Sequence, residues 1–247
     1  MRRDGADGGA AAAWSLVVPL KPLVRAKSRL SRAAGEEFRP RLALAFAQDT
    51  VAAALACADV RDVVVVTDDR LAAERLAALG ARIVPDPPGG GLNAALAHGA
   101  EAVRAGRPGA PVAALNADLP ALRPAELARV LHSAALFPRA FLADAAHFGT
   151  TLLTASSGVK LAPAFGGASR SRHLASGAQE ITAPDVPSVR RDVDTGEDLL
   201  AALALGVGPH TARQAPRVAA GADGGEPPGG PAGSSGPVPP QVRASGA

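Results

Sequence analysis

Short apolar runs alternate along the chain with longer segments whose apolar positions recur at helical spacing. The run Val63-Val64-Val65-Val66 is wholly apolar and β-branched, which is typical of a central strand buried on both faces of a parallel sheet. The pattern predicts strands at residues 14–19, 62–67, 81–84, 112–115, 140–143, 150–155 and 189–193. It predicts helices at residues 36–56, 71–79, 92–105, 124–136 and 169–176, and a final helix, capped by Asp194 or Thr195, that ends at Leu205.

This alternation predicts one α/β domain, with a mostly parallel sheet and helices on both faces in a Rossmann-like three-layer arrangement. We expect the domain to span residues 14–212. Residues 1–13 are rich in Gly and Ala, and residues 213–247 in Gly, Pro, Ala and Ser. Both segments are predicted to be disordered tails, because they cannot bury enough apolar surface to offset the entropy lost on ordering.

Composition narrows the class of protein. With 3% aromatic residues, the core is expected to consist of Val, Leu and Ala, and the single cysteine, Cys57, excludes an internal disulfide. Arg2-Arg3 and the apolar residues 10–20 imitate a signal peptide, but aspartates intervene and the run is too short to span a bilayer. We therefore expect a cytoplasmic protein without a membrane segment. The net charge of +3, without interleaved aromatic residues or a nucleic-acid motif, favours small anionic ligands over DNA or RNA.

The first predicted strand opens into a basic loop. Lys21, Arg25, Lys27 and Arg29 fall within nine residues, and two of the chain's three lysines are among them. Compact ammonium charges between a strand and a helix suit the binding of phosphate groups, although a solvated basic loop explains the same charges. The loop has neither the Walker pattern nor the Gly-x-Gly-x-x-Gly fingerprint, which argues against P-loop NTPases and ordinary Rossmann dehydrogenases.

Carboxylates follow two other predicted strands. Asp118 comes directly after the strand at residues 112–115 and precedes Leu119-Pro120, a position from which it can hold a hard cation. Asp192 and Asp194 are expected to project from one face of the strand at residues 189–193, where a cation would relieve their repulsion. The alternatives are a turn at Asp118, a helix cap at Asp194 and a salt bridge from Asp192 to an arginine.

Further polar clusters stand at the ends of other strands. Gly89-Gly90-Gly91-Leu92-Asn93 enters a helix, where Asn93 can face a nucleobase edge or simply begin the helix. Asp68 or Asp69 is expected to cap the next helix. Gly149-Thr150-Thr151 and the segment at residues 165–173 form a plausible pocket for a small phosphorylated acid. His173 lacks a second metal ligand at suitable spacing, and we expect it on the surface.

Taken in order, these motifs resemble the phospholactate/phosphoenolpyruvate guanylyltransferase family of coenzyme F(420) biosynthesis, which is related to molybdopterin guanylyltransferase. The resemblance covers nearly all of residues 14–212. The residues that carry it are Pro19-Leu20-Lys21-Pro22, Ala26-Lys27-Ser28-Arg29-Leu30, Gly91-Leu92-Asn93, Ala117-Asp118-Leu119-Pro120, Gly149-Thr150-Thr151, Phe165-Gly166-Gly167-Ala168-Ser169 and Asp192-Val193-Asp194-Thr195. The resemblance implies a nucleotide-diphospho-sugar transferase-like fold.

The resemblance also implies a role for individual residues. Nucleotide binding falls to Pro19, Lys21, Lys27, Leu92 and Asn93, and catalysis by positive charge to Lys21, Arg25 and Lys27. It implies that Asp118, Asp192 and Asp194 hold Mg²⁺, and that Thr151, Gly166 and Ser169 bind the three-carbon acid. His147-Phe148 departs from the family pattern, which more often has small residues there.

The implied reaction is guanylyl transfer from GTP to a small phosphorylated three-carbon acid, with a downstream transferase as a partner for the labile product and a monomeric or homodimeric enzyme. We expect phosphoenolpyruvate as acceptor, because the Arg- and Ala-rich composition resembles that of actinobacterial proteins whose relatives use it. The alternatives are 2-phospho-L-lactate or 3-phosphoglycerate, a nucleotidyltransferase that acts on a sugar phosphate or molybdopterin, and a non-catalytic nucleotide-binding protein.

Overall fold

The computed structural model describes residues 13–23, 38–87 and 90–214 of the chain. Within them, seven strands form one sheet in the order β3-β2-β1-β4-β6-β5-β7. The strands are β1 (Trp14–Pro19), β2 (Val60–Val66), β3 (Arg82–Val84), β4 (Val112–Leu115), β5 (Arg139–Ala143), β6 (Thr150–Ala155) and β7 (Gln179–Glu180). The helices are α2 (Arg39–Leu55), α3 (Arg70–Ala77), α4 (Gly91–Gly106), α5 (Pro124–Ala134), α6 (Ser169–Ala175), α7 (Pro187–Arg190) and α8 (Gly196–Leu205).

The sheet is mostly parallel, as predicted. β1 pairs in parallel with β2 and β4, and β5 with β7, whereas β6 runs antiparallel to both of its neighbours. Because β6 is reversed, its first residue lies at the sheet edge where β1, β4 and β5 end. The loops that follow β1 and β4 and the loop that joins β5 to β6 therefore meet at one edge.

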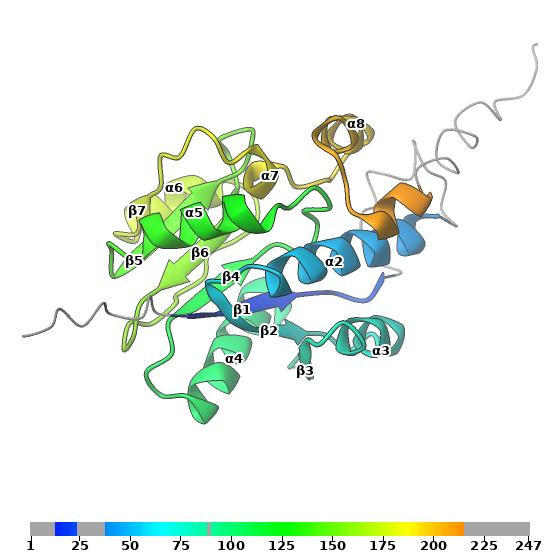
Figure 1. The fold of residues 1–247 in the computed structure, drawn as a ribbon. Coiled ribbons are helices and arrows are strands. Elements are labelled where there is room, and N and C mark those ends of the chain that lie inside the picture. Colours follow the sequence, from blue (N-terminus) through cyan, green and yellow to red (C-terminus); the bar gives the residue numbers. More distant parts are fainter. Residues whose placement is uncertain (1–12, 24–37, 88–89, 215–247) are drawn as a thin grey trace, which may run out of the picture.

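Helices cover both faces of the sheet, which confirms the predicted architecture (Figure 1). Leu16 and Val18 of β1 pack with residues of α2, α3 and α5 on one face. Val17, between them, packs with residues of α4 on the other face. The alternation of side chains along an extended strand produces this division, since successive residues point to opposite faces.

The segment after α8 folds back onto α2. Buried Asp49 accepts hydrogen bonds from the backbone amides of His210 (3.0 Å) and Thr211 (2.7 Å), at the start of a helical segment at residues 209–214. Two of its residues lie beyond residue 212, the predicted end of the domain. The rest of the predicted tails, residues 1–12 and 215–247, lies outside the described part of the chain.

The prediction of a strand at residues 189–193 is wrong. Residues Pro187–Arg190 form the short helix α7, and the chain then runs without regular structure to α8. A proline at the first turn favours a helix, and the amide and hydroxyl of Ser188 bind Glu126 of α5 rather than a neighbouring strand. The apolar pattern of this segment reflects burial of Val189 and Val193 in different environments, not strand pairing.

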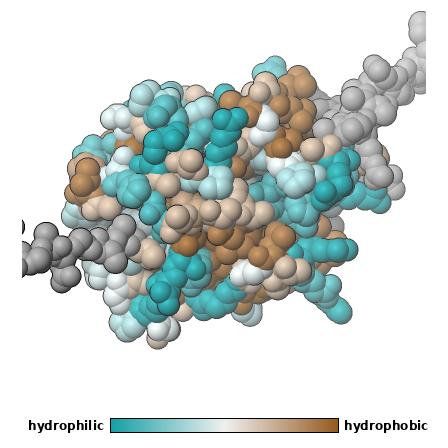
Figure 2. Space-filling view, in the orientation of Figure 1, coloured by the Kyte–Doolittle hydropathy of each residue, from teal (hydrophilic) through white to brown (hydrophobic). Residues whose placement is uncertain are grey.

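The surface is mixed in polarity over the face shown in Figure 2, with hydrophobic surface gathered at the position of α8. α8 carries Leu200, whose side chain is largely exposed. No helix in the described ranges is long and apolar enough to cross a membrane.

Close contact between α4 and the sheet depends on Gly99. A Cβ atom at this position would lie 2.4 Å from Val17 Cγ1 and 2.8 Å from Val66 Cγ2, so Gly99→Ala forces the helix or the strands to move. We predict that Gly99→Ala lowers the free energy of unfolding by about 1–3 kcal/mol, the usual cost of overpacking a core.

Gly106→Ala, in the same helix, is the matched control, because among the described residues no atom beyond its chain neighbours and its own helix backbone lies within 4 Å of the added Cβ. Urea denaturation of both variants measures the effect. Equal stability of the two variants would show that the contact at Gly99 does not limit the packing of α4.

Candidate active site

A cavity of about 470 Å³ opens at the edge of the sheet where β1, β4 and β5 end and β6 begins. Its size lies in the range of small-molecule sites, and its position agrees with the rule that ligands of open α/β sheets bind beyond the strand ends. It is lined by Pro19, Leu20, Ala43, Leu92, Asn116, Ala117, Asp118, Asp144, Phe148, Gly149, Thr150, Phe165, Gly166, Gly167, Ser169, Asp192 and Asp194.

The three aspartates predicted to bind metal all line this cavity. Asp118 follows β4, and its carbonyl accepts a hydrogen bond from the backbone amide of Val193 at 3.0 Å. This bond joins two segments that are far apart in the sequence and places Asp192 and Asp194 beside Asp118. The hydroxyl of Thr50, buried in α2, accepts from the amide of Leu119 at 3.0 Å and fixes the turn after Asp118.

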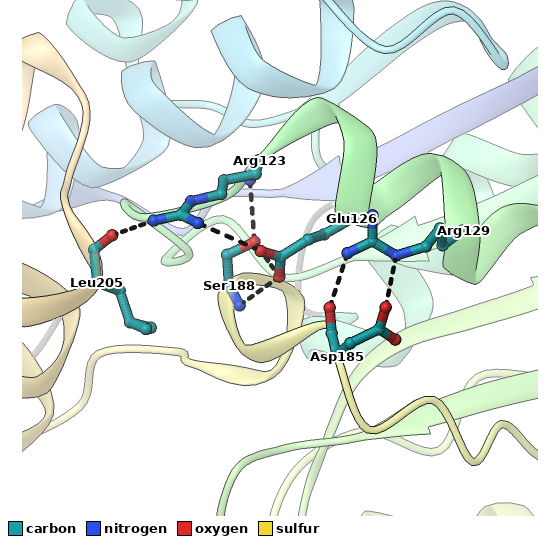
Figure 3. Close-up of polar contacts among 6 residues, drawn as sticks. All are labelled: Arg123, Glu126, Arg129, Asp185, Ser188 and Leu205. Carbon is teal, nitrogen blue, oxygen red and sulfur yellow. Dashed lines mark hydrogen bonds and ion pairs between the residues drawn. The ribbon is translucent and has the colours of Figure 1, made fainter.

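A polar network between α5 and α7 holds the segment that leads to Asp192 (Figure 3). Glu126 is 5% exposed and accepts hydrogen bonds from the amide and the hydroxyl of Ser188, both at 2.8 Å. Arg123 lies 3.7 Å from Glu126 and donates to the carbonyl of Leu205, and Arg129 donates to the carbonyl of Asp185 at 2.7 Å. α5 thus fixes α7 and the end of α8, and the chain between them carries Asp192 and Asp194.

The start of α8 limits the roles open to Asp194. Thr195 caps the helix, and its side chain and that of Asp198 form a reciprocal capping box. Of the two predicted caps, Thr195 is therefore the one used, and the exposed carboxylate of Asp194 lines the cavity. For α3, the predicted cap was Asp68 or Asp69. The structure shows Asp69 as the cap, because its carboxylate accepts a hydrogen bond from the amide of Ala72 at 3.0 Å.

A loop at residues 164–169 supplies another part of the cavity lining. Asn93 binds its backbone through both ends of the side-chain amide: it accepts from Phe165 N at 2.7 Å and donates to Phe165 O at 3.2 Å. Arg172 donates to the carbonyl of Ala164 at 3.1 Å and also to that of Gly166. The Asn93 amide, predicted to bind the nucleotide, thus holds the loop that contains the predicted acid-binding residue Gly166.

Gly166 and Ser169 line the cavity, but Thr151 does not, and its neighbour Thr150 does. The two threonines lie next to each other in β6, and successive strand residues point to opposite faces. Thr151 is fully buried, and its carbonyl accepts from the amide of Asn116 at 3.0 Å. The structure therefore brings together two of the three residues predicted to bind the acid.

His173 is buried, contrary to the expectation of a surface residue. Its ring packs against Phe141 and Phe165, at centroid distances of 5.6 and 5.2 Å. Burial, together with the positive charges of Arg139 and Arg172, lowers the pKa of His173 to about 4. The expectation of a surface position rested only on the lack of a second metal ligand at suitable spacing from His173. Such spacing gives no information on whether the side chain is buried.

One cavity residue, Asp144, went unnoticed in the sequence, and Phe148 was noted only as a departure from the family pattern. The Asp144 carboxylate accepts from the amides of Phe148 (2.9 Å) and Gly149 (2.7 Å), which folds the loop between β5 and β6 back on itself. A Cβ at Gly149 would lie 2.4 Å from Asp144 Oδ2, so a larger residue here would displace the Asp144 carboxylate from this position. The loop presents Phe148, 60% exposed, at the cavity.

The basic loop is described only at its beginning. Pro19 lines the cavity, as does Leu92 at the start of α4, whereas Lys21 is not among the lining residues. The Nζ atom of Lys21 lies 2.5 Å from Asp86 Oδ2 in an ion pair. Arg25 and Lys27 lie outside the described residues.

The carboxylates of the cavity suit a metal ion that also binds substrate phosphates better than a metal ion coordinated by protein groups alone. Within the part of the chain that the structure describes, no three His, Cys, Asp or Glu residues lie close enough together to hold a metal ion. Mg²⁺ commonly binds through one or two carboxylates and takes its remaining ligands from water and substrate phosphates. Asp118 and Asp192, in one cavity, fit that donor set.

Comparison of the sequence with known proteins finds a matching family. The model of the family described as guanylyl transferase CofC like matches residues 14–216. The phosphoenolpyruvate guanylyltransferase of Streptomyces coelicolor is 70% identical over 205 residues, which cover 83% of this chain and 97% of that protein. The protein of the same name from Streptomyces avermitilis is also 70% identical over 205 residues, with coverage of 83% and 95%.

The fold has counterparts among solved structures. A protein from Desulfovibrio desulfuricans G20, described as a nucleotide-diphospho-sugar transferase, superposes with a TM-score of 0.62 at 16% identity. The match covers 85% of this chain and 98% of that one. The predicted nucleotide-diphospho-sugar transferase-like fold is therefore confirmed.

The low pKa of His173 predicts a pH dependence of stability. Between pH 6.5 and about 4 the unfolded chain takes up a proton at this position and the folded protein does not, so the free energy of unfolding falls as the pH falls. The contribution lost is about 3 kcal/mol.

His173→Gln, which does not titrate, is expected to lack this component, and His98→Gln on α4 is the control. Urea denaturation at pH 7 and pH 4.5 measures the change. The assignment would be contradicted if His173→Gln and wild type lost the same stability over this range.

Proposed function

Because the chain belongs to the family of CofC-like guanylyl transferases, we propose that it transfers GMP from GTP to phosphoenolpyruvate and releases pyrophosphate. The family expected from the sequence is thereby confirmed. The observation that carries the choice of acceptor is the 70% identity, over 97% of its length, to a protein named phosphoenolpyruvate guanylyltransferase. The products are enolpyruvyl-diphospho-guanosine and pyrophosphate, and the pathway served is coenzyme F(420) biosynthesis.

In this reaction a phosphate oxygen of the acceptor attacks the α-phosphorus of GTP. A bond forms between that oxygen and the α-phosphorus, and the bond from the α-phosphorus to the oxygen that bridges to the β-phosphorus breaks. The acceptor phosphate is already anionic near neutral pH, so no general base is needed to activate it. The cavity accordingly needs no Ser, His or Cys nucleophile. Its task is to hold the acceptor phosphate and the α-phosphate of GTP in line for the attack.

The obstacle to this step is the repulsion between two phosphate-bearing molecules. Asp118 and Asp192, with Asp194 beside them, would hold the Mg²⁺ that offsets part of this negative charge when it is bound. Lys21, Arg25 and Lys27 are proposed to offset the rest from the basic loop. Exchange of the Asp86 partner of Lys21 for a phosphate oxygen would then accompany nucleotide binding.

The two ligands are proposed to occupy different walls of the cavity. Pro19 and Leu92 line the cavity, and we assign them to the nucleotide together with Lys27. Gly166 and Ser169 line another part of its wall, which we assign to the three-carbon acid. In this arrangement Thr151 and Asn93 support that wall through the backbone contacts described above.

We further propose a cytoplasmic enzyme that hands its labile diphosphate product to a downstream transferase. The single cysteine, Cys57, is buried, and burial raises the pKa of its thiol, so this side chain suits a reducing compartment. The enzyme is expected to act as a monomer or a homodimer.

The acceptor is tested by pyrophosphate release from GTP and Mg²⁺ with phosphoenolpyruvate, 2-phospho-L-lactate or 3-phosphoglycerate. We predict the highest kcat/KM with phosphoenolpyruvate, and no comparable activity when UTP, CTP or ATP replaces GTP. Faster release with another acceptor would revise the substrate, and the absence of release with every acceptor would contradict the proposed function.

The carboxylates are tested by Asp118→Asn and Asp192→Asn. Each change removes a negative charge from the proposed metal site, so kcat/KM should fall by about 100-fold, comparable to the loss of one group that stabilises charge in a transition state. The Mg²⁺ concentration needed for half-maximal activity should rise.

Asp185→Asn provides the matched control, because its largely exposed carboxylate pairs with Arg129 outside the cavity. Circular dichroism verifies that each variant is folded. Folded Asp118→Asn with wild-type activity would remove this residue from the site.

A further inference from the structure

A second cavity, of about 310 Å³, opens between α2, α3 and the helical segment at residues 209–214, which lies beside α2 in Figure 1. Among the described residues, none lines both this cavity and the candidate active site. A volume of this size is at the lower end of the range for small-molecule sites, so the cavity suits a small ligand.

The charged side chains that line this cavity are all arginines. Arg41 comes from α2, Arg75 from α3 and Arg213 from the segment at residues 209–214. Among the described residues that line the cavity there is no Asp or Glu. Three guanidinium groups around one cavity repel one another, and a bound anion relieves that repulsion.

The chain balances a neighbouring arginine in a different way. Arg70, also on α3, pairs with Glu74, and its Nε atom lies 2.9 Å from Glu74 Oε1. Within the described ranges, none of the three arginines of the second cavity has an ion pair with a carboxylate. Their charge is therefore left to solvent or to a ligand.

A hydrogen bond between two lining residues adds a further donor. Arg213 Nη2 lies 2.9 Å from His210 Nδ1. A guanidinium group can only donate, so Nδ1 accepts and carries no hydrogen. The neutral ring then has its hydrogen on Nε2, and the other N–H groups of Arg213 remain donors. Both side chains thus offer donors on the segment at residues 209–214.

Asp49 holds this segment against α2. Its carboxylate is 4% exposed, and its two oxygens accept from the backbone amides of His210 and Thr211, at 3.0 and 2.7 Å. A Cβ at Gly208 would lie 2.4 Å from Asp49 Cγ, which shows how closely the segment approaches the helix. Asp49 is not among the lining residues, so its contacts fix the cavity wall without placing a carboxylate in it.

We propose that the second cavity binds a small phosphate anion, with pyrophosphate preferred over inorganic phosphate. Guanidinium groups have the planar donor geometry that matches phosphate oxygens, and here they come from three separate elements. Pyrophosphate is preferred because it carries the larger negative charge near neutral pH. The bound anion bridges α2, α3 and the segment at residues 209–214. This site is separate from the proposed guanylyl transfer and does not depend on it.

Isothermal titration calorimetry with pyrophosphate, in low-salt buffer that contains EDTA, tests the proposal directly. Without divalent metal, GTP or acceptor, the measurement needs no turnover, so its failure is distinct from a failure of the proposed function. We expect saturable binding with a Kd of about 1 mM or lower, and weaker binding at high ionic strength. Inorganic phosphate should bind more weakly. The absence of saturable binding of pyrophosphate to wild type would overturn the proposal.

Variants locate the bound anion. Arg75→Gln and Arg213→Gln should each weaken pyrophosphate binding about 10- to 100-fold, as for a lost bond to a charged group. Arg70→Gln removes the same charge from α3 outside the cavity and should bind as wild type does. Loss of binding in Lys21→Gln, with neither cavity variant affected, would place the anion at the basic loop and contradict the proposal.

Thermal unfolding gives a second readout. A ligand that binds the folded protein raises Tm as its concentration rises. Pyrophosphate should raise the Tm of wild type and of Arg70→Gln, and that of Arg75→Gln much less. Without pyrophosphate, Arg75→Gln should be at least as stable as wild type, because the change removes repulsion between arginines. An equal rise in Tm for Arg75→Gln and wild type would show that this cavity is not the site.

Discussion

The arrangement of the cavity depends on one backbone hydrogen bond, from the amide of Val193 to the carbonyl of Asp118. It joins the loop after β4 to the segment between α7 and α8, and without it the predicted metal-binding carboxylates would belong to separate parts of the surface. The bond holds because each segment is fixed independently: Thr50 binds the turn after Asp118, and Glu126 of α5 binds Ser188 of α7. Buried polar groups satisfied in this way favour a single arrangement of the chain.

The part of the cavity lined by Phe165, Gly166 and Gly167 is held in the same way. The loop at residues 164–169 has little regular structure, and side chains of Asn93, Arg172 and His173 bind its backbone from two different helices. A site that must place two anions in line gains from such rigidity, because a small displacement of either ligand lowers the rate steeply. The cavity lining thus combines carboxylates with the apolar rings of Phe148 and Phe165.

Most of the fold could be predicted from periodicity, since buried strands such as β2 and amphipathic helices such as α5 have distinct patterns. The same patterns failed for α7, where the apolar residues Val189 and Val193 imitate a strand but Pro187 and the Glu126–Ser188 bonds favour a helix. The position of Asp118 was predictable because it follows β4, and residues after the strands of such a sheet tend to meet at one edge. Asp192 and Asp194 reach the cavity from the segment between α7 and α8, which is not a strand, so the rule does not account for them and only the family resemblance grouped them with Asp118. The burial of His173, the role of Asp144 and the exchange of Thr151 for Thr150 at the cavity were not, because each depends on contacts between segments distant in sequence.

The central claim is that Asp118 and Asp192 meet in one cavity that receives a metal ion together with GTP. It is tested most directly by anomalous diffraction from crystals grown with Mn²⁺ and a non-hydrolysable GTP analogue. The account predicts a Mn²⁺ peak in the cavity, at a coordination distance of about 2 Å from carboxylate oxygens of both Asp118 and Asp192. A nucleotide-bound ion held elsewhere, with neither aspartate in contact, would contradict it.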